Sequence, residues 1–234
     1  QVDENPFYAF IITLTSHTPF EMPEDYHELD IRKEHRDNMI GDYLQAIHYT
    51  DKQIGKFIDN LKKEGLYEDT VIALYGDHFA ISTTQEEAGL MKDIIGEEYD
   101  FDHMMNVPLV IHIPGEDINE TITTVGSQLD FYPTIMNIMG YDNTKGLVFG
   151  RDLTNYKGRN VVASQTYMLK GSFIDEDVVF EISRDGIFEH SRAIDRHTRK
   201  PLDVEQFRKK SEAITKEIDM SNYILKTDFL KGGK

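Results

Sequence analysis

The sequence contains no cysteine and no tryptophan, and no apolar run in it approaches the length of a membrane-spanning helix. Without cysteine the chain forms no disulfide bond and offers no thiolate, so a metal would have to be held by carboxylates, imidazoles or hydroxyls. A membrane helix takes roughly 20 apolar residues, and the start of the sequence shows no signal-peptide pattern. These absences indicate a globular domain in which only oxygen and nitrogen atoms are available as metal ligands.

Basic residues are also scarce, with 25 Lys and Arg against 42 Asp and Glu, which gives a formal net charge of −17. Such a chain repels phosphate backbones, so a nucleic-acid partner is excluded. The acidity is typical of a solvated surface that keeps a protein soluble. The 39% hydrophobic content, with 13 Phe and 12 Tyr, suffices for a core in one large domain or a domain with a small appendage.

Uncharged, β-branched segments alternate with amphipathic ones through the first part of the chain. The apolar segments predict strands and the segments with three- and four-residue spacing predict helices. The predicted strands cover residues 7–15, 70–75 and 107–115, and the predicted helices cover residues 38–64, 83–95 and 127–140. This alternation is typical of a parallel sheet with crossover helices.

The pattern changes after about residue 150. Short alternating segments, separated by turns, run from residue 160 to residue 191 and predict an antiparallel meander, and a charged helix is expected over residues 203–219. We therefore predict an α/β fold with a doubly wound, mainly parallel sheet and a small C-terminal α+β antiparallel subdomain. The predicted boundary separates residues 1–155 from residues 156–234.

Two polar sites follow the first two predicted strands. Ser16-His17 come after the strand at 7–15, and Asp77-His78 come after the strand in "VIALYGDHFAIS", residues 71–82. In an open parallel sheet, ligands bind beyond the carboxyl ends of the strands. Gly76 eases a turn that would let Asp77 and His78 act together, as one oxygen and one nitrogen ligand for Mn²⁺, Zn²⁺ or Mg²⁺. On spacing alone, an Asp-His pair is more often an ordinary loop.

Other polar residues have simpler interpretations. His112 lies inside an apolar strand and is better explained as a hydrogen-bonded core histidine. Asp130 before "FYPTIM" is explained as a helix N-cap, and Asp102-His103 either reaches the cleft or lies in a loop. His48 and His190 are assigned to surface or core. The "RHTRK" segment, residues 196–200, either forms a solvated turn or weakly attracts an anionic polymer through its positive charges.

Several segments resemble those of the alkaline phosphatase/sulfatase superfamily, both in their amino-acid sequences and in their order along the chain. The segments are "SHTPFEMP", "YLQAIHYTDKQIGKFIDNLKKEGLYEDTVIALYGDH", "VPLVIHIPG" and "SQLDFYPTIMNIMG". Within the superfamily the likeness is greatest to the extracellular catalytic domain of lipoteichoic acid synthases, which are phosphoglycerol transferases of Gram-positive bacteria. It covers residues 1–155 well and the C-terminal region more loosely.

The resemblance implies roles for four residues. Asp77 and His78 match the paired metal ligands of the family, with Mn²⁺ preferred over Mg²⁺ or Zn²⁺. His17 matches a residue that contacts the phosphate or glycerol of the substrate, and Ser82 falls where this branch has a hydroxyl near the bound head group. The family usually has Gly at position 80, where this sequence has Ala80.

The resemblance also implies that the N-terminal part of the fold lies outside these 234 residues. The family's nucleophilic Thr and a further acidic metal ligand precede the equivalent of His17, and Thr13 and Thr15 do not fit the nucleophile because they lie within the first predicted strand. The chain thus matches the C-terminal part of a catalytic domain, carries no catalytic nucleophile, and is not expected to turn over alone.

The implied reaction moves glycerol phosphate from phosphatidylglycerol to a glycerol-phosphate polymer through a phospho-Thr intermediate. The domain would stand on the extracellular face of the cell membrane, anchored by an upstream segment or released by cleavage. Two copies could pair through an exposed sheet edge. The alternatives are a sulfatase or phosphoethanolamine transferase of the same superfamily, or a non-catalytic scaffold or binding fragment.

Overall fold

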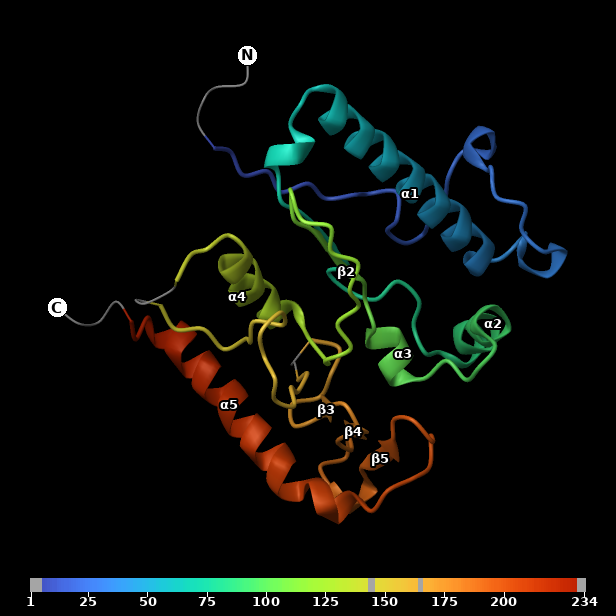
Figure 1. Cartoon of the computed structure of the whole chain (residues 1–234). Helices are drawn as coiled ribbons and strands as arrows, with labels where there is room; N and C mark the ends of the chain where they lie inside the picture. Colours follow the sequence, from blue (N-terminus) through green and yellow to red (C-terminus); the bar gives the residue numbers. More distant parts are fainter. Residues whose placement is uncertain (1–5, 143–145, 164–165, 231–234) are drawn as a thin grey trace. The chain divides into compact units, whose positions relative to one another are not determined.

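The computed structural model of the chain describes residues 6–142, 146–163 and 166–230 (Figure 1). The chain forms two compact units, Gln1–Ile118 and Asn119–Lys234. The first unit contains helices α1 (Met39–Lys63), α2 (Gln85–Ile95) and α3 (Phe101–Met105) and strands β1 (Ile72–Tyr75) and β2 (Leu109–His112). The second contains α4 (Gln128–Ile138), β3 (Phe173–Ile174), β4 (Val178–Glu181), β5 (Arg192–Asp195) and α5 (Arg208–Thr227).

Helix α1 is the long amphipathic helix that the sequence predicts. Asn38 caps its start, because its side-chain oxygen accepts the amides of Ile40 and Gly41. The apolar face of α1 contributes to a core of four buried residues, which are Phe20, Ile40, Ala46 and Ile81. This core joins the segment before α1 to the loop after β1, so it holds together the two regions in which the predicted site residues lie.

The parallel sheet predicted for this unit is not found in the described residues. Strands β1 and β2 pair antiparallel, from Ile72 opposite His112 to Tyr75 opposite Leu109. Because β2 begins opposite the end of β1, the intervening residues do not carry the chain back to the start of β1, as a parallel crossover requires.

The first predicted strand is also absent as a strand. Residues 7–15 belong to neither ladder, and the structure describes most of them as irregular chain. Their apolar sequence fits an interior strand, but a strand exists only where a neighbour takes up its backbone hydrogen bonds. Among the described residues no such neighbour is present.

The second unit contains the predicted antiparallel meander, as strands β3, β4 and β5 in that order. Its core consists of Phe173, Val178, Phe180, Ala193 and Ile214, the last of which comes from α5. The segment at 186–191, expected to be a strand, contains a 3-10 helix at Phe188–His190, and the last strand follows it. The expected strand at 160–167 is reduced to one bridge between Val162 and Ile174, and residues 164–165 lie outside the described residues.

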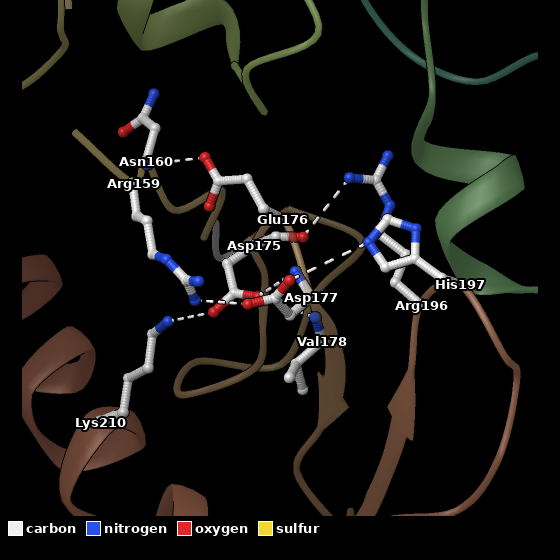
Figure 2. Close-up of polar contacts among 9 residues, drawn as sticks. All are labelled: Arg159, Asn160, Asp175, Glu176, Asp177, Val178, Arg196, His197 and Lys210. Atoms are coloured by element: carbon white, nitrogen blue, oxygen red, sulfur yellow. Dashed lines mark hydrogen bonds and ion pairs between the residues drawn. The ribbon is translucent and has the colours of Figure 1, made fainter. Parts of the chain in front are cut away.

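A charged cluster fastens the β3–β4 turn in this unit (Figure 2). Asp175 is almost fully buried, and its Oδ1 accepts the amides of Asp177 at 2.9 Å and Val178 at 2.7 Å. Lys210 from α5 donates to the other oxygen of Asp175, and Arg159 pairs with Asp177. The positive charges of Lys210 and Arg159 are thus paired with nearby carboxylates. The cluster therefore stabilises the β3–β4 turn and is not a binding site for an anion.

Helix α4 belongs to the second unit. Asp130, buried near its start, accepts the amide of Arg151 at 2.6 Å and the side-chain amide of Asn160 at 2.9 Å. Asp130 is not the N-cap that the sequence suggested, because Ser127 holds that position and Asp130 completes a capping box three residues later. The boundary between the two structural units lies after residue 118. The boundary predicted at residue 155 concerns the extent of a catalytic core and stays a prediction.

Candidate functional site

The predicted metal ligands follow directly on β1. The amide of Gly76 donates to the carbonyl of Pro108 at 3.0 Å, which extends the contact between the two strands by one step. A Cβ atom at Gly76 would lie 2.8 Å from the Cβ of Val107, so a larger residue would push the strands apart. The glycine therefore brings the chain close to the start of β2 just before Asp77 and His78.

The imidazole of His78 is oriented by its own backbone. Its Nδ1 lies 2.6 Å from the carbonyl oxygen of Phe79, which can only accept, so Nδ1 carries the proton in the neutral ring. The lone pair of the neutral ring is then on Nε2. A histidine that ligates a metal is commonly fixed in this way, by a hydrogen bond from its other ring nitrogen.

The carboxylate of Asp77 lies beside this nitrogen. Its Oδ1 is 3.9 Å from His78 Nε2. Two ligands that each bind one cation at about 2.1 Å lie at most about 4.2 Å apart, so this separation is compatible with a shared divalent ion. The donor set of one carboxylate and one imidazole fits Mn²⁺ or Zn²⁺.

His17 lies next to this pair, although it comes from a distant part of the sequence. The rings of His17 and His78 have centroids 5.7 Å apart and stand edge to face. His17 sits in a tight turn, where its amide donates to Leu14 and its carbonyl accepts from Phe20. Its Nδ1 contacts the carbonyl of Thr18 at 2.8 Å, so its ring has the same tautomer as His78. Phe20, buried against Tyr43 of α1, anchors the turn.

Ser82 has a local partner. Its hydroxyl donates to the carboxylate of Glu87 in α2 and accepts the amide of Thr84 at 3.3 Å. Thr84 is the N-cap of α2, so Ser82 belongs to the hydrogen bonds that start this helix. Its predicted contact with a head group stays a prediction, and Glu87, which the sequence did not single out, is the residue that fixes its position.

The remaining polar candidates have structural partners. His112 is half-buried and stacked on Tyr67 with ring centroids 4.3 Å apart, its Nδ1 lies 3.4 Å from the Tyr67 hydroxyl, and its buried Nε2 has no hydrogen-bond partner among the described residues. His103 accepts the amide of Asp100 at 3.3 Å as part of the capping box of α3. His190 lies 2.6 Å from Asp185 in the loop between β4 and β5.

No group of three or more His, Asp or Glu residues suited to a metal occurs within residues 6–142, 146–163 and 166–230. Asp77 and His78 therefore stay a predicted pair of metal ligands, with His17 beside them. In the same described ranges, none of the helices has the length and apolar character to cross a membrane.

Comparison with known proteins decides the family. Residues 1–141 match the family described as Sulfatase. The chain belongs to the sulfatase family. The matched residues of this sulfatase-family chain include His17, Asp77, His78 and Ser82. The family as a whole is metal-dependent, which agrees with the donor set of Asp77 and His78.

Curated relatives of this sulfatase-family chain include lipoteichoic acid synthases. It is 33% identical over 234 residues to the lipoteichoic acid synthase of Staphylococcus saprophyticus, covering 98% of this chain and 34% of that protein. It is 32% identical to lipoteichoic acid synthase 2 of Bacillus subtilis, covering 97% of this chain and 33% of that protein. The chain thus spans about a third of the length of the curated relatives it matches.

A solved structure agrees with these relatives. The crystal structure of the lipoteichoic acid synthase LtaP from Listeria monocytogenes matches this sulfatase-family chain with a TM-score of 0.79 and 28% sequence identity. The match covers 94% of this chain and 53% of the LtaP chain. The fold of the chain is therefore that of part of a sulfatase-like domain.

Proposed function

We propose that the chain is part of the catalytic domain of a phosphoglycerol transferase of the lipoteichoic acid synthase type. The domain transfers glycerol phosphate from a phosphatidylglycerol-type lipid to a growing glycerol-phosphate polymer. The observation that carries the proposal is the approach of His17 to His78, beside Asp77, in a chain whose relatives are lipoteichoic acid synthases. This grouping joins a metal-binding pair to a hydrogen-bonding residue suited to a phosphate.

Each site residue has a distinct task. Asp77 and His78 hold a divalent cation, Mn²⁺ by preference, and when bound this cation stabilises the negative charge that develops on the transferred phosphoryl group. His17 orients the phosphate or glycerol of the donor. Ser82 contributes its hydroxyl to the head group after rotating from Glu87, or holds the loop in place through Glu87. The nucleophilic Thr comes from a part of the protein outside these residues, so the chain alone does not turn over.

The proposed substrates place the domain on the extracellular face of the cell membrane. A phosphatidylglycerol head group is reached at the membrane surface, so the domain works either anchored there by another part of the protein or after release by cleavage. The acidic surface of the chain would keep it from lying on anionic lipid without a held cation.

A sulfatase activity is the second candidate, favoured by the family whose description matches residues 1–141. A phosphoethanolamine transferase would share the same metal pair. The three activities differ in the group transferred, so an assay with the three donors separates them.

A chimera tests the proposal. In Listeria monocytogenes LtaP, the region that matches this chain is replaced by residues 1–234, and the purified chimera is supplied with labelled phosphatidylglycerol and Mn²⁺. We expect release of diacylglycerol and labelling of a glycerol-phosphate product. The proposal would be contradicted if the chimera acted on a sulfate ester or a phosphoethanolamine lipid but not on phosphatidylglycerol.

Variants of the chimera test the site. Asp77→Ala and His78→Ala are expected to lower the rate at least about a hundredfold, in keeping with loss of a metal ligand. Asp185→Ala is the matched control, because Asp185 is another exposed aspartate beside a histidine but lies in the β4–β5 loop. If Asp77→Ala kept the wild-type rate, the assignment of Asp77 as a metal ligand would be contradicted.

A further inference from the structure

The hydroxyl of Ser82 already takes part in two hydrogen bonds. Its proton is donated to the carboxylate of Glu87, which lies in the first turn of α2. Its oxygen also accepts the amide of Thr84 at 3.3 Å. A serine hydroxyl offers one proton and two lone pairs, so among the described residues one lone pair of Ser82 remains for a ligand.

The carboxylate of Glu87 fixes the direction of the Ser82 proton. One carboxylate oxygen, Oε2, accepts the hydroxyl protons of both Ser82 and Thr84, the latter at 2.8 Å. An ionised carboxylate can only accept, so Ser82 has to be the donor in this contact. Glu87 is half-buried, and a hydrogen bond to a charged group is stronger than one between neutral groups. Ser82 is therefore held as a hydrogen-bond acceptor toward any further partner.

The backbone beside Ser82 is fixed by a second contact. The hydroxyl of Tyr99 donates to the carbonyl of Ile81 at 2.8 Å, and the side chain of Ile81 is buried in the core of the first unit. Burial, with smaller contributions from Tyr43 and from the charge of Glu87, raises the pKa of Tyr99 to about 12. Tyr99 thus keeps its proton and stays a donor at neutral pH. The loop holds Ser82 in place for its contact with Glu87.

We infer that Glu87 is a positioning residue that makes Ser82 select head groups carrying a hydroxyl. The inference rests on the proposed function, in which Ser82 contacts the head group of the donor lipid. Because the proton of Ser82 is committed to Glu87, its remaining lone pair accepts a hydrogen bond from a glycerol hydroxyl. A phosphate or sulfate oxygen, which can only accept, finds no donor there. Ser82 serves the head group without rotating away from Glu87.

Charge gives the bound head group a direction. The cation proposed at Asp77 and His78 attracts the phosphate, whereas the carboxylate of Glu87 repels it. Glycerol phosphate is therefore favoured with its phosphate at the cation and its hydroxyls at Ser82. An ammonium group also donates hydrogen bonds, so the same arrangement accepts ethanolamine and disfavours head groups that have no donor.

A purely structural role of Glu87 in α2 is the alternative explanation of these contacts. Thr84 is the N-cap of the helix, and its hydroxyl accepts the amide of Glu87 at 3.4 Å. If Glu87 only supported this cap, its replacement would loosen the start of the helix and would weaken all ligands equally. A positioning role instead changes the preference between ligands with and without hydroxyls.

Two ligands that differ only in their hydroxyls test the inference. Glycerol 3-phosphate and n-propyl phosphate carry the same phosphate, and only the first has hydroxyls. Calorimetric titration of the LtaP chimera in Mn²⁺ measures both affinities. We expect the chimera to prefer glycerol 3-phosphate at least about tenfold, and Glu87→Ala to reduce this preference to less than about threefold. An unchanged preference in Glu87→Ala would overturn the inference, even if both affinities fell.

Three further variants separate positioning from other effects. Glu86→Ala is the matched control, because Glu86 is an exposed acid in the same helical turn, and it should keep the tenfold preference. Glu87→Gln should keep it too, since the amide oxygen of glutamine can accept both hydroxyl protons. Ser82→Ala should lose the preference, and adding Glu87→Ala to it should change nothing more. A further change in the double variant would make Glu87 a direct contact of the ligand and would overturn its positioning role.

The outcomes distinguish a failure of this inference from a failure of the proposed function. If the chimera transfers glycerol phosphate from phosphatidylglycerol but Glu87→Ala keeps the preference, only the inference fails. If the chimera neither binds glycerol 3-phosphate nor acts on phosphatidylglycerol, the proposed function fails and the inference fails with it.

Discussion

The imidazole rings of His17 and His78 lie edge to face, with centroids 5.7 Å apart. His17 follows the apolar segment at the start of the chain, whereas His78 follows β1. The two loops meet because Phe20 and Ile81, a few residues beyond each histidine, are buried in the same core with Ile40 of α1. Packing of apolar side chains therefore positions two polar groups that are themselves partly exposed.

His17 is predicted to serve the substrate rather than the metal. The variant His17→Ala should bind Mn²⁺ with an affinity within about threefold of the wild type, because Asp77 and His78 remain. Its affinity for glycerol 3-phosphate in the presence of Mn²⁺ should fall at least tenfold, through loss of a hydrogen bond to a charged group. Calorimetric titration of the chain with each ligand measures both quantities. An equal loss of Mn²⁺ binding would instead make His17 a metal ligand.

Two glycines of α1 should respond in opposite ways to alanine. At Gly55 a new Cβ meets nothing within 4 Å, so Gly55→Ala should raise the free energy of unfolding by about 1 kcal/mol through helix propensity. At Gly41 the Cβ would lie 1.8 Å from the carbonyl oxygen of His35. Gly41→Ala should therefore lower the free energy of unfolding by about 2 kcal/mol, despite the gain in propensity. Urea denaturation followed by circular dichroism measures both, and stabilisation by Gly41→Ala would contradict the packing of the His35 loop on α1.

The ion pair of Lys210 and Asp175 should matter far more than that of Arg159 and Asp177 (Figure 2). The side chain of Asp175 is only 8% exposed, so Lys210→Met leaves a buried carboxylate without its cation and should cost about 2 kcal/mol. Arg159 is 76% exposed, and Arg159→Met should change the free energy of unfolding by less than about 0.5 kcal/mol. Urea midpoints at unchanged m-values measure the difference, and equal costs would show that burial of Asp175 is not the cause.

Tyr99 should make the protein sensitive to alkali. Burial, with smaller contributions from Tyr43 and Glu87, raises the pKa of Tyr99 from 10.0 to about 12. A group with a raised pKa favours the folded state fully below the unfolded value, and this stability is lost as the pH rises from 10 to 12. The loss should be at most about 2 kcal/mol, because Tyr99 is only partly buried and solvent screens the effect, and Tyr99→Phe should lack this part of the pH dependence. Urea denaturation at pH 8 and pH 11.5 measures it. A wild-type pH dependence in Tyr99→Phe would assign the alkaline loss to other groups.

The sequence was sufficient for α1, α2 and α4, whereas α3 was not expected and the roles of the site residues stay predictions. The three- and four-residue spacing of apolar residues is a local signal, and the helices predicted over residues 38–64, 83–95 and 127–140 are found at Met39–Lys63, Gln85–Ile95 and Gln128–Ile138. The order of motifs placed His17, Asp77 and His78 in a shared site, and the structure brings these three together.

The sheet of the first unit could not be predicted in the same way, whereas the antiparallel meander of the second unit was predicted. An apolar run such as residues 7–15 indicates that a strand is possible, but the pairing partner is a property of the whole fold, and the described residues do not supply one. The antiparallel pairing of β1 and β2 depends on where the chain re-enters the sheet at Leu109. Likewise, the contact between Ser82 and Glu87 depends on the helix that starts at Gln85, and no sequence pattern around Ser82 predicts this contact.

The most direct test of the metal site is a crystal structure of the chain with Mn²⁺, read by anomalous scattering. The account predicts an anomalous peak within about 2.3 Å of both Asp77 and His78 Nε2, with the ring of His17 facing it. The Asp77→Asn crystal should lose the peak, whereas Asp185→Asn should retain it. A peak elsewhere on the chain, or one that persists in Asp77→Asn, would contradict the assignment of these residues as the metal-binding pair.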